Sequence, residues 1–161
     1  MSNSVTPAVD SAQSDATAQP VGIAQPVEPV QPTIASAFAD RKALIGFVTA
    51  GDPTLDTTRQ LVIGMAEAGC DLVELGIPFS DPVAEGPVIQ EASLRSLQGG
   101  TTLDGIFGMV AQLRESCSVP LVFMGYMNPV LHYGMDRFFA RCRDLGVAGI
   151  IVAVSYTHLT L

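Results

Sequence analysis

Residues 71–87, with the sequence DLVELGIPFSDPVAEGP, decide the expected fold. Asp71 to Leu75 is a short apolar run that contains one carboxylate, Glu74, and a loop rich in proline and glycine follows it up to Pro87. A short apolar run bounded by turn residues predicts a buried strand. Parallel α/β folds place their reactive groups in the loops that directly follow such strands.

The same pattern repeats on both sides of this stretch. Further strands are predicted at Leu44–Val48, Val119–Met124 and Val147–Val152. Helices are predicted at Ile34–Asp40, Leu55–Ala68, Val88–Leu97, Leu103–Glu115 and Met135–Leu145. This alternation predicts an α/β fold with parallel strands joined by right-handed crossovers. Doubly wound sheets and (β/α)₈ barrels both begin in this way, and periodicity alone does not separate them.

Glycine and proline mark the expected breaks between these elements. Gly69 and Gly146 are expected to end the helices that precede them. Residues 99–102, GGTT, predict a turn between two helices, since they match no complete phosphate-binding motif. Gly125–Pro129 predicts a turn-rich loop.

Composition excludes several classes of function. Sixteen acidic residues oppose eight basic ones, and the net charge of −8 argues against nucleic acid or an anionic membrane as partner. The apolar runs are too short to span a membrane, and the N-terminus does not resemble a secretory signal. Cys70, Cys117 and Cys142 are widely spaced, which predicts three buried free thiols rather than a zinc or redox motif. These features favour a cytoplasmic protein.

The two ends of the chain differ from its centre. Residues 1–32 contain five prolines and no lysine or arginine, which predicts a disordered leader or a mis-called start codon. Residues 33–153 carry the α/β pattern and form the expected domain. Residues 154–161, VSYTHLTL, resemble a translated sequencing adapter, the alternative being a natural strand and terminus.

Two carboxylates are the leading catalytic candidates. Glu74 stands within an apolar strand, where a charge is costly unless it is paired or protonated. Such a residue suits a proton shuttle, although a solvated strand end or a structural ion pair fits the pattern equally well. Glu85 follows eleven residues later on the loop, and two carboxylates at one site suit proton transfer combined with stabilisation of a cation. Spacing alone also allows a solvated loop charge.

Other polar residues have simpler interpretations. Asp52 before Pro53 and Asp81 before Pro82 predict turn or cap residues. His132 has no second ligand at metal spacing, which predicts a surface or packing histidine and no metal site.

Four ordered motifs, found between about Ile34 and Ala153, carry a resemblance to a known family. They are FVTAGDP at 47–53, ELGIPFSDPVAEGPVIQ at 74–90, MGYMNP at 124–129 and the segment 146–152. Together they resemble the tryptophan synthase alpha subunit family. The resemblance implies a (β/α)₈ TIM barrel of which this chain holds about strands one to four.

The resemblance also implies a chemistry. The family cleaves indole-3-glycerol phosphate to indole and glyceraldehyde 3-phosphate, a retro-aldol reaction of tryptophan biosynthesis that needs no organic cofactor. Glu74 matches the general acid/base, and Glu85 matches the acidic residue that accepts the indole N–H. The commoner residue at position 85 is aspartate, so the extra methylene moves the carboxylate by roughly 1.5 Å unless the loop adjusts. The positions that match the wall of the indole pocket are Phe47, Ile89, Met124 and Tyr126.

A partner is implied as well. The family's beta subunit, which holds pyridoxal phosphate, receives the indole in an alpha2beta2 heterotetramer. The positions that match the surface facing it are Pro78, Asp81, Pro82, Val83, Asn128 and Pro129. Asp81 is the one expected to order the loop and signal between the subunits.

The resemblance places the phosphate site on late loops of the barrel, so the chain as printed is expected to be inactive or insoluble. Two alternatives remain open at this point. One is a stand-alone indole-releasing lyase, and the other is a non-catalytic subunit that only activates its partner.

Overall fold

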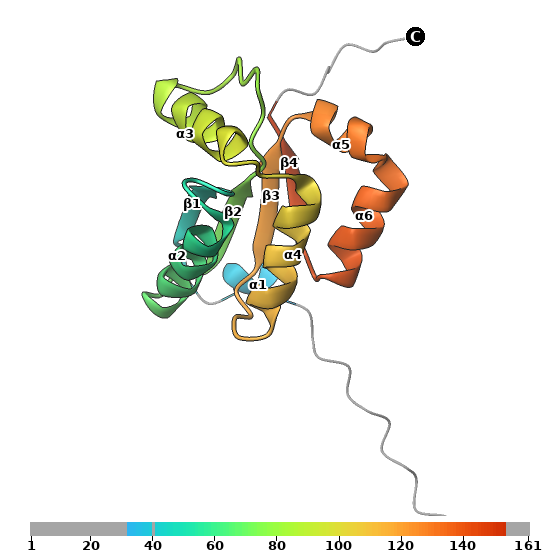
Figure 1. The fold of residues 1–161 in the computed structure, drawn as a ribbon. Helices are drawn as coiled ribbons and strands as arrows, with labels where there is room; N and C mark the ends of the chain where they lie inside the picture. The colour runs from blue at the N-terminus through green and yellow to red at the C-terminus, as the bar shows by residue number, and fades with distance from the viewer. Residues whose placement is uncertain (1–31, 40, 154–161) are drawn as a thin grey trace, which may run out of the picture.

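A computed structural model of the chain describes residues 32–39 and 41–153 (Figure 1). The strands of this part are β1 (Ile45–Thr49), β2 (Leu72–Gly76), β3 (Leu121–Gly125) and β4 (Gly149–Val152). The helices are α1 (Ile34–Ala37), α2 (Leu55–Glu67), α3 (Pro87–Gln98), α4 (Leu103–Arg114), α5 (Met127–Tyr133) and α6 (Met135–Asp144). The predicted leader up to residue 31 and the predicted tail 154–161 lie outside the described residues.

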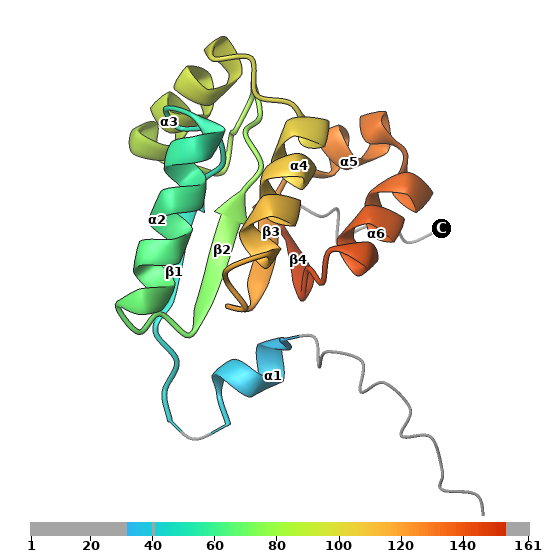
Figure 2. The same ribbon diagram turned by 60° about the horizontal axis from the view of Figure 1, so that its bottom comes forward.

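The described strands form one parallel sheet in the order β1-β2-β3-β4, which confirms the predicted parallel topology. Helices α2, α4 and α6 lie on the same face of this sheet (Figures 1 and 2). A doubly wound sheet reverses its strand order and carries helices on both faces. Sequential strands with their helices on one face are the arrangement of a (β/α)₈ barrel.

Alternation along the strands separates two faces of the sheet. On the helix-covered face, Val73 and Leu75 of β2 are fully buried in the main core, together with Phe123 of β3. Phe107 of α4 packs edge-on against Phe123, with 5.7 Å between the ring centroids. The opposite face, called the inner face below, is covered near the amino ends of its strands by α1, where Ala37 packs against Leu72 and Val122. Nearer its carboxyl end, Glu74 and Met124 on this face are half-buried.

The helices begin and end where the sequence provides caps. The hydroxyls of Thr54 and Thr102 accept hydrogen bonds from the first turns of α2 and α4. Gly69 and Gly146 follow α2 and α6 with φ angles of 94° and 62°, which confirms their predicted role because glycine adopts these angles without steric cost. No helix within residues 32–39 and 41–153 is long and apolar enough to span a membrane.

The prediction of a loop at Gly125–Pro129 was wrong, because helix α5 begins at Met127. Proline usually interrupts a helix because it lacks an N–H group. Pro129, however, is the third residue of α5, and the first four N–H groups of a helix have no partner within the helix. The proline therefore fits the first turn without the loss of a hydrogen bond.

Several predicted boundaries also shift. Helix α1 is a single turn that ends at Ala37, three residues before the predicted end, since Phe38 has already left the helical conformation. Strands β3 and β4 each begin two residues later than predicted, at Leu121 and Gly149. The residue before β3 is Pro120, which has no N–H group to donate to a neighbouring strand.

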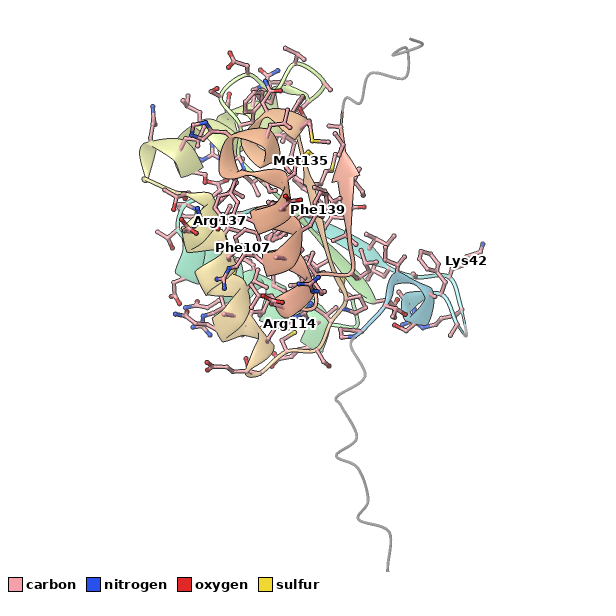
Figure 3. All side chains as sticks on the ribbon, turned by 90° about the vertical axis from the view of Figure 1, so that its right-hand side faces the viewer. Lys42, Phe107, Arg114, Met135, Arg137 and Phe139 are labelled. Carbon is pink, nitrogen blue, oxygen red and sulfur yellow. The ribbon has the colours of Figure 1, made fainter. Side chains whose placement is uncertain are left out.

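Arg114 joins two loops at the amino end of the sheet. It is the last residue of α4, and its guanidinium donates to the carbonyls of Cys117 and Val119 in the loop before β3, at 3.4 and 2.7 Å. It also donates to the carbonyls of Leu145 and Gly146 in the turn after α6, at 3.1 and 2.9 Å. Figure 3 shows Arg114 at the lower end of α4 and α6. Burial of the Arg114 side chain lowers the pKa of its guanidinium.

All three cysteines are free thiols, but only Cys142 is buried. The expectation of burial was wrong for Cys70 and Cys117, which are half-buried, because they follow the ends of α2 and α4 instead of lying on a buried helix face. Cys142 lies on α6, where burial raises the pKa of its thiol from 9.0 to about 11.

Cys142 should therefore resist alkylation. The raised pKa lowers the thiolate fraction at neutral pH by about a hundredfold, and the thiolate is the reactive form. We expect iodoacetamide at pH 7.5 to label Cys142 at least about 100-fold more slowly in the folded chain than in urea. Peptide mass spectrometry over time measures this, and equal rates in both states would contradict it. Because the folded-state pKa is the higher one, alkaline ionisation should destabilise the fold between pH 9.0 and about 11.

Candidate active site

The carboxyl ends of β1, β2 and β3 meet the start of α3 around a small pocket on the inner face. Phe47 of β1, Ile89 of α3, Met124 of β3 and Tyr126 after β3 all line it. These are the four positions expected to form an apolar wall, and the fold brings all of them together. Glu85, from the loop between β2 and α3, lines the same pocket.

Tyr126 contacts Glu85 and the loop that carries it. Its hydroxyl donates a hydrogen bond to Oε2 of Glu85 and accepts one from the backbone N–H of Ala84 at 2.8 Å. Its ring lies against Phe79 with 5.0 Å between centroids. Burial, and then the bond to Glu85, raise the pKa of the Tyr126 phenol above its ordinary value of 10.0. The phenol therefore remains a proton donor throughout the neutral range.

Glu74 occupies the middle of β2, in register with Phe47 on β1 and Val122 on β3. Its strand neighbours Val73 and Leu75 are buried beneath the helices, so alternation places the half-buried Glu74 on the inner face. Within the described part of the chain, its side chain forms no hydrogen bond or ion pair. A structural ion pair, one of the alternatives left by the sequence, is therefore absent from the described residues.

A side chain at Gly76 would displace the ring of Phe47. Gly76 lies two residues beyond Glu74 on the same face and lines the pocket, whereas Glu74 does not. A Cβ atom at Gly76 would lie 2.7 Å from Cζ of Phe47, which is closer than real Cβ contacts allow. Absence of a side chain at Gly76 thus allows the Phe47 ring to lie across β2, beside Glu74.

Asp52 lies in the turn after β1, as predicted, and both oxygens of its carboxylate accept hydrogen bonds there. Arg95 of α3 donates two hydrogen bonds to its carboxylate, at 2.9 and 2.8 Å. These bonds hold the pKa of the Asp52 carboxyl below its ordinary value. The pair ties the β1 turn to α3, which carries one wall of the pocket.

The remaining polar candidates lie outside the pocket. His132 is exposed on α5, in agreement with a surface histidine, and residues 99–102 form the predicted turn between α3 and α4. Asp81 is exposed and accepts a hydrogen bond from the Ser80 hydroxyl. Across residues 32–39 and 41–153, no three His, Cys, Asp or Glu side chains are grouped as a metal site would require.

The positions expected to face a partner lie on one rim, formed by the loop after β2 and the start of α5. Asp81, Val83 and Asn128 are exposed, and Val83 exposes 82% of its surface. Pro78 is buried within the described chain, and its place at a partner surface stays a prediction. Pro78 and Pro129 instead line a second cavity of about 430 Å³ beside this rim.

Sequence reasoning missed one polar residue of the pocket, Ser93, and assigned no role of its own to a second, Thr49. Both are buried, with 4% and 8% of their surfaces exposed. Periodicity carried a signal for each of them. Ser93 lies four residues after Ile89 on one face of α3, and Thr49 lies two residues after Phe47 on one face of β1.

Comparison with known proteins agrees with this geometry. The model of the family described as tryptophan synthase alpha chain matches residues 35–155. The chain belongs to this family. The alpha chain of Alkaliphilus metalliredigens is 53% identical over 113 residues, which cover 70% of this chain and 42% of the relative.

Solved structures show the same relationship. Tryptophan synthase subunit alpha from Legionella pneumophila str. Paris superposes with a TM-score of 0.68 at 42% identity, covering 70% of this chain and 43% of that one. A chain of the tryptophan synthase complex from Pyrococcus furiosus superposes with a TM-score of 0.65 at 41% identity, covering 68% and 45%. The chain thus spans less than half the length of these relatives. Its sheet corresponds to the first four strands of their (β/α)₈ barrel.

Proposed function

We propose that this chain supplies the two catalytic carboxylates of a tryptophan synthase alpha subunit, a lyase that cleaves indole-3-glycerol phosphate. One observation carries the proposal: Glu85 lies at a pocket walled by Phe47, Ile89 and Met124, and Glu74 lies on the same face of the sheet. Apolar walls suit the faces of an indole ring, and a single carboxylate suits its N–H group. The cavity has a volume of about 20 Å³, so its walls must move apart to admit the ring.

The two carboxylates have complementary roles in the cleavage. Glu74, as a carboxylic acid, gives its proton to C3 of the indole ring, and the ring becomes an iminium-like cation. The carboxylate of Glu85 accepts the indole N–H and stabilises the positive charge. The bond between C3 and the glycerol side chain then breaks, and its electron pair returns to the ring. The ionised Glu74 takes the proton of the adjacent side-chain hydroxyl, whose oxygen becomes the aldehyde of glyceraldehyde 3-phosphate.

This chemistry needs no organic cofactor on the alpha subunit. The iminium-like ring itself accepts the electron pair, which is the task that pyridoxal phosphate performs in other lyases. Phosphate binding is assigned to the second half of the barrel, where loops and a helix N-terminus hold such groups in this fold.

The exposed rim beside the pocket is proposed to face a beta subunit. It is formed by Asp81, Pro82, Val83, Asn128 and Pro129, and its proximity to the pocket suits direct transfer of indole. The Pyrococcus furiosus relative is part of a tryptophan synthase complex, which supports a heteromeric assembly. Asp81, Pro82 and Asn128, which match the family's partner-facing positions, favour the partnered form over a stand-alone lyase.

The test uses a completed barrel, in which residues 33–153 are continued by strands five to eight of the Legionella pneumophila subunit. We expect it to release indole from indole-3-glycerol phosphate, and added beta subunit to raise the rate by about tenfold or more. Absorbance of released indole measures both rates. A barrel that unfolds cooperatively yet releases no indole would overturn the proposal.

The same assay separates the alternatives. A stand-alone lyase would release indole at its full rate without the beta subunit. A non-catalytic activator would release none but would still raise the turnover of the beta subunit.

A further inference from the structure

Tyr126 connects the end of β3 to three positions in the loop between β2 and α3. Its ring packs on Phe79, and its hydroxyl is bonded to both Ala84 and Glu85. Lining a pocket requires only the ring of this residue. The two hydrogen bonds of the hydroxyl are a separate feature, and the roles assigned so far leave them unexplained.

The carboxylate of Glu85 depends on this hydroxyl for its position. Its backbone is held by the N–H bond to the carbonyl of Pro82 at 3.2 Å and by the Gln90 side chain, which donates to the Glu85 carbonyl at 2.9 Å. For the carboxylate, Tyr126 is the sole hydrogen-bond donor among the described residues. A glutamate on a loop has three rotatable side-chain bonds, so without this contact its charge would spread over several rotamers.

We propose that Tyr126 is a positioning residue, whose hydroxyl holds the carboxylate of Glu85 in the place where it accepts the indole N–H. This role rests on the proposed function. Oε2 of Glu85 is bound to Tyr126, so Oε1 remains free for the substrate. The contact also gives the longer glutamate a fixed location at a position where the family commonly has aspartate.

The hydrogen bonds run in one direction, from the Ala84 N–H through the Tyr126 hydroxyl to the carboxylate. Successive bonds of this kind polarise and strengthen one another. The raised pKa of the phenol keeps it protonated, so it can donate to Glu85 throughout the neutral range. The loop and the carboxylate are thereby fixed by the same group.

Tyr126→Phe in the completed barrel removes the hydroxyl and keeps the ring that packs on Phe79. We expect kcat for indole release to fall by about 10- to 100-fold, with KM changed by less than about threefold. The same substitution added to Glu85→Ala should change kcat by less than about twofold, since the group that it positions is already absent. The proposal would be overturned if Tyr126→Phe lowered kcat equally in the parent barrel and in the Glu85→Ala barrel. It would also be overturned if the single variant Tyr126→Phe kept a rate within twofold of the parent.

Tyr133→Phe is the matched control. It removes another tyrosine hydroxyl that donates to a carboxylate, the bond of 2.6 Å to Asp104, outside the active-site pocket. We expect its kcat to stay within twofold of the parent. A loss as large as that of Tyr126→Phe would show that any such deletion damages the barrel, and would overturn a specific role for Tyr126.

A spectroscopic measurement tests the contact independently of activity. The ¹³C signal of labelled Tyr126, assigned by its loss in Tyr126→Phe, should titrate at a lower pH in Glu85→Gln, because the carboxylate raises the phenol's pKa. An unchanged midpoint would overturn the contact and the proposal with it. If the completed barrel releases indole but the Tyr126 midpoint does not depend on Glu85, only the positioning role is overturned. If the completed barrel releases no indole, the proposed function itself is overturned.

Discussion

Replacing Glu74 with glutamine in the completed barrel is expected to lower kcat for indole release by about a thousandfold. Glutamine keeps the size of the side chain but can neither give a proton to C3 of the indole nor take one from the hydroxyl. Glu74 makes no hydrogen bond or ion pair to another described residue, so the substitution breaks no structural contact there. The loss should therefore appear in kcat, while KM and the urea midpoint stay close to those of the parent.

Glu67→Gln provides the matched control for this prediction. Glu67 is exposed at the end of α2, on the helix-covered side of the sheet, and the same chemical change there should leave kcat within twofold of the parent. An unaffected rate in Glu74→Gln would remove Glu74 from the mechanism. A completed barrel that released no indole yet activated the beta subunit normally would instead support the non-catalytic alternative.

The elements of the fold could be predicted because each carries its own local signal. Strand β2 is a short apolar run closed by turn residues, and α2 ends at a glycine with positive φ. Helix α5 was missed because the rule that proline interrupts helices does not apply to the first turn. Barrel and doubly wound topologies could not be separated, since they differ in which face of the sheet the helices cover, and a repeating strand–helix pattern does not record this.

The site was predictable to the extent that it follows the strand ends. Phe47, Met124 and Glu85 converge because parallel strands end at the same edge of a sheet. The bond between Tyr126 and Glu85 could not be predicted, because it spans 41 positions and depends on the path of a loop. Ser93 was not predicted, because a single serine on a helix is typical of an exposed polar position. Only the fold shows that Ser93 faces the pocket.

Arg114 is the clearest feature that the sequence does not reveal. An arginine at the end of a helix is typical of a surface residue that interacts favourably with the last carbonyls of that helix. Here the guanidinium is buried enough to lower its pKa, and it binds carbonyl groups from two loops without an acidic partner among the residues described. Its contribution is to hold together chain segments that precede β3 and β4.

Arg114→Met is expected to lower the free energy of unfolding of the completed barrel by about 3 kcal/mol, because up to four backbone carbonyls lose a charged donor. With a slope of about 2 kcal/mol per molar, the urea midpoint should fall by about 1.5 M. Arg114→Lys keeps the charge but not the planar group that reaches both loops, so its loss should be intermediate. Arg143→Met, at a position 80% exposed on α6, should cost less than about 0.5 kcal/mol. Equal midpoints for Arg114→Met and Arg143→Met would show that water replaces the guanidinium without cost, and that the two loops are held by the barrel itself.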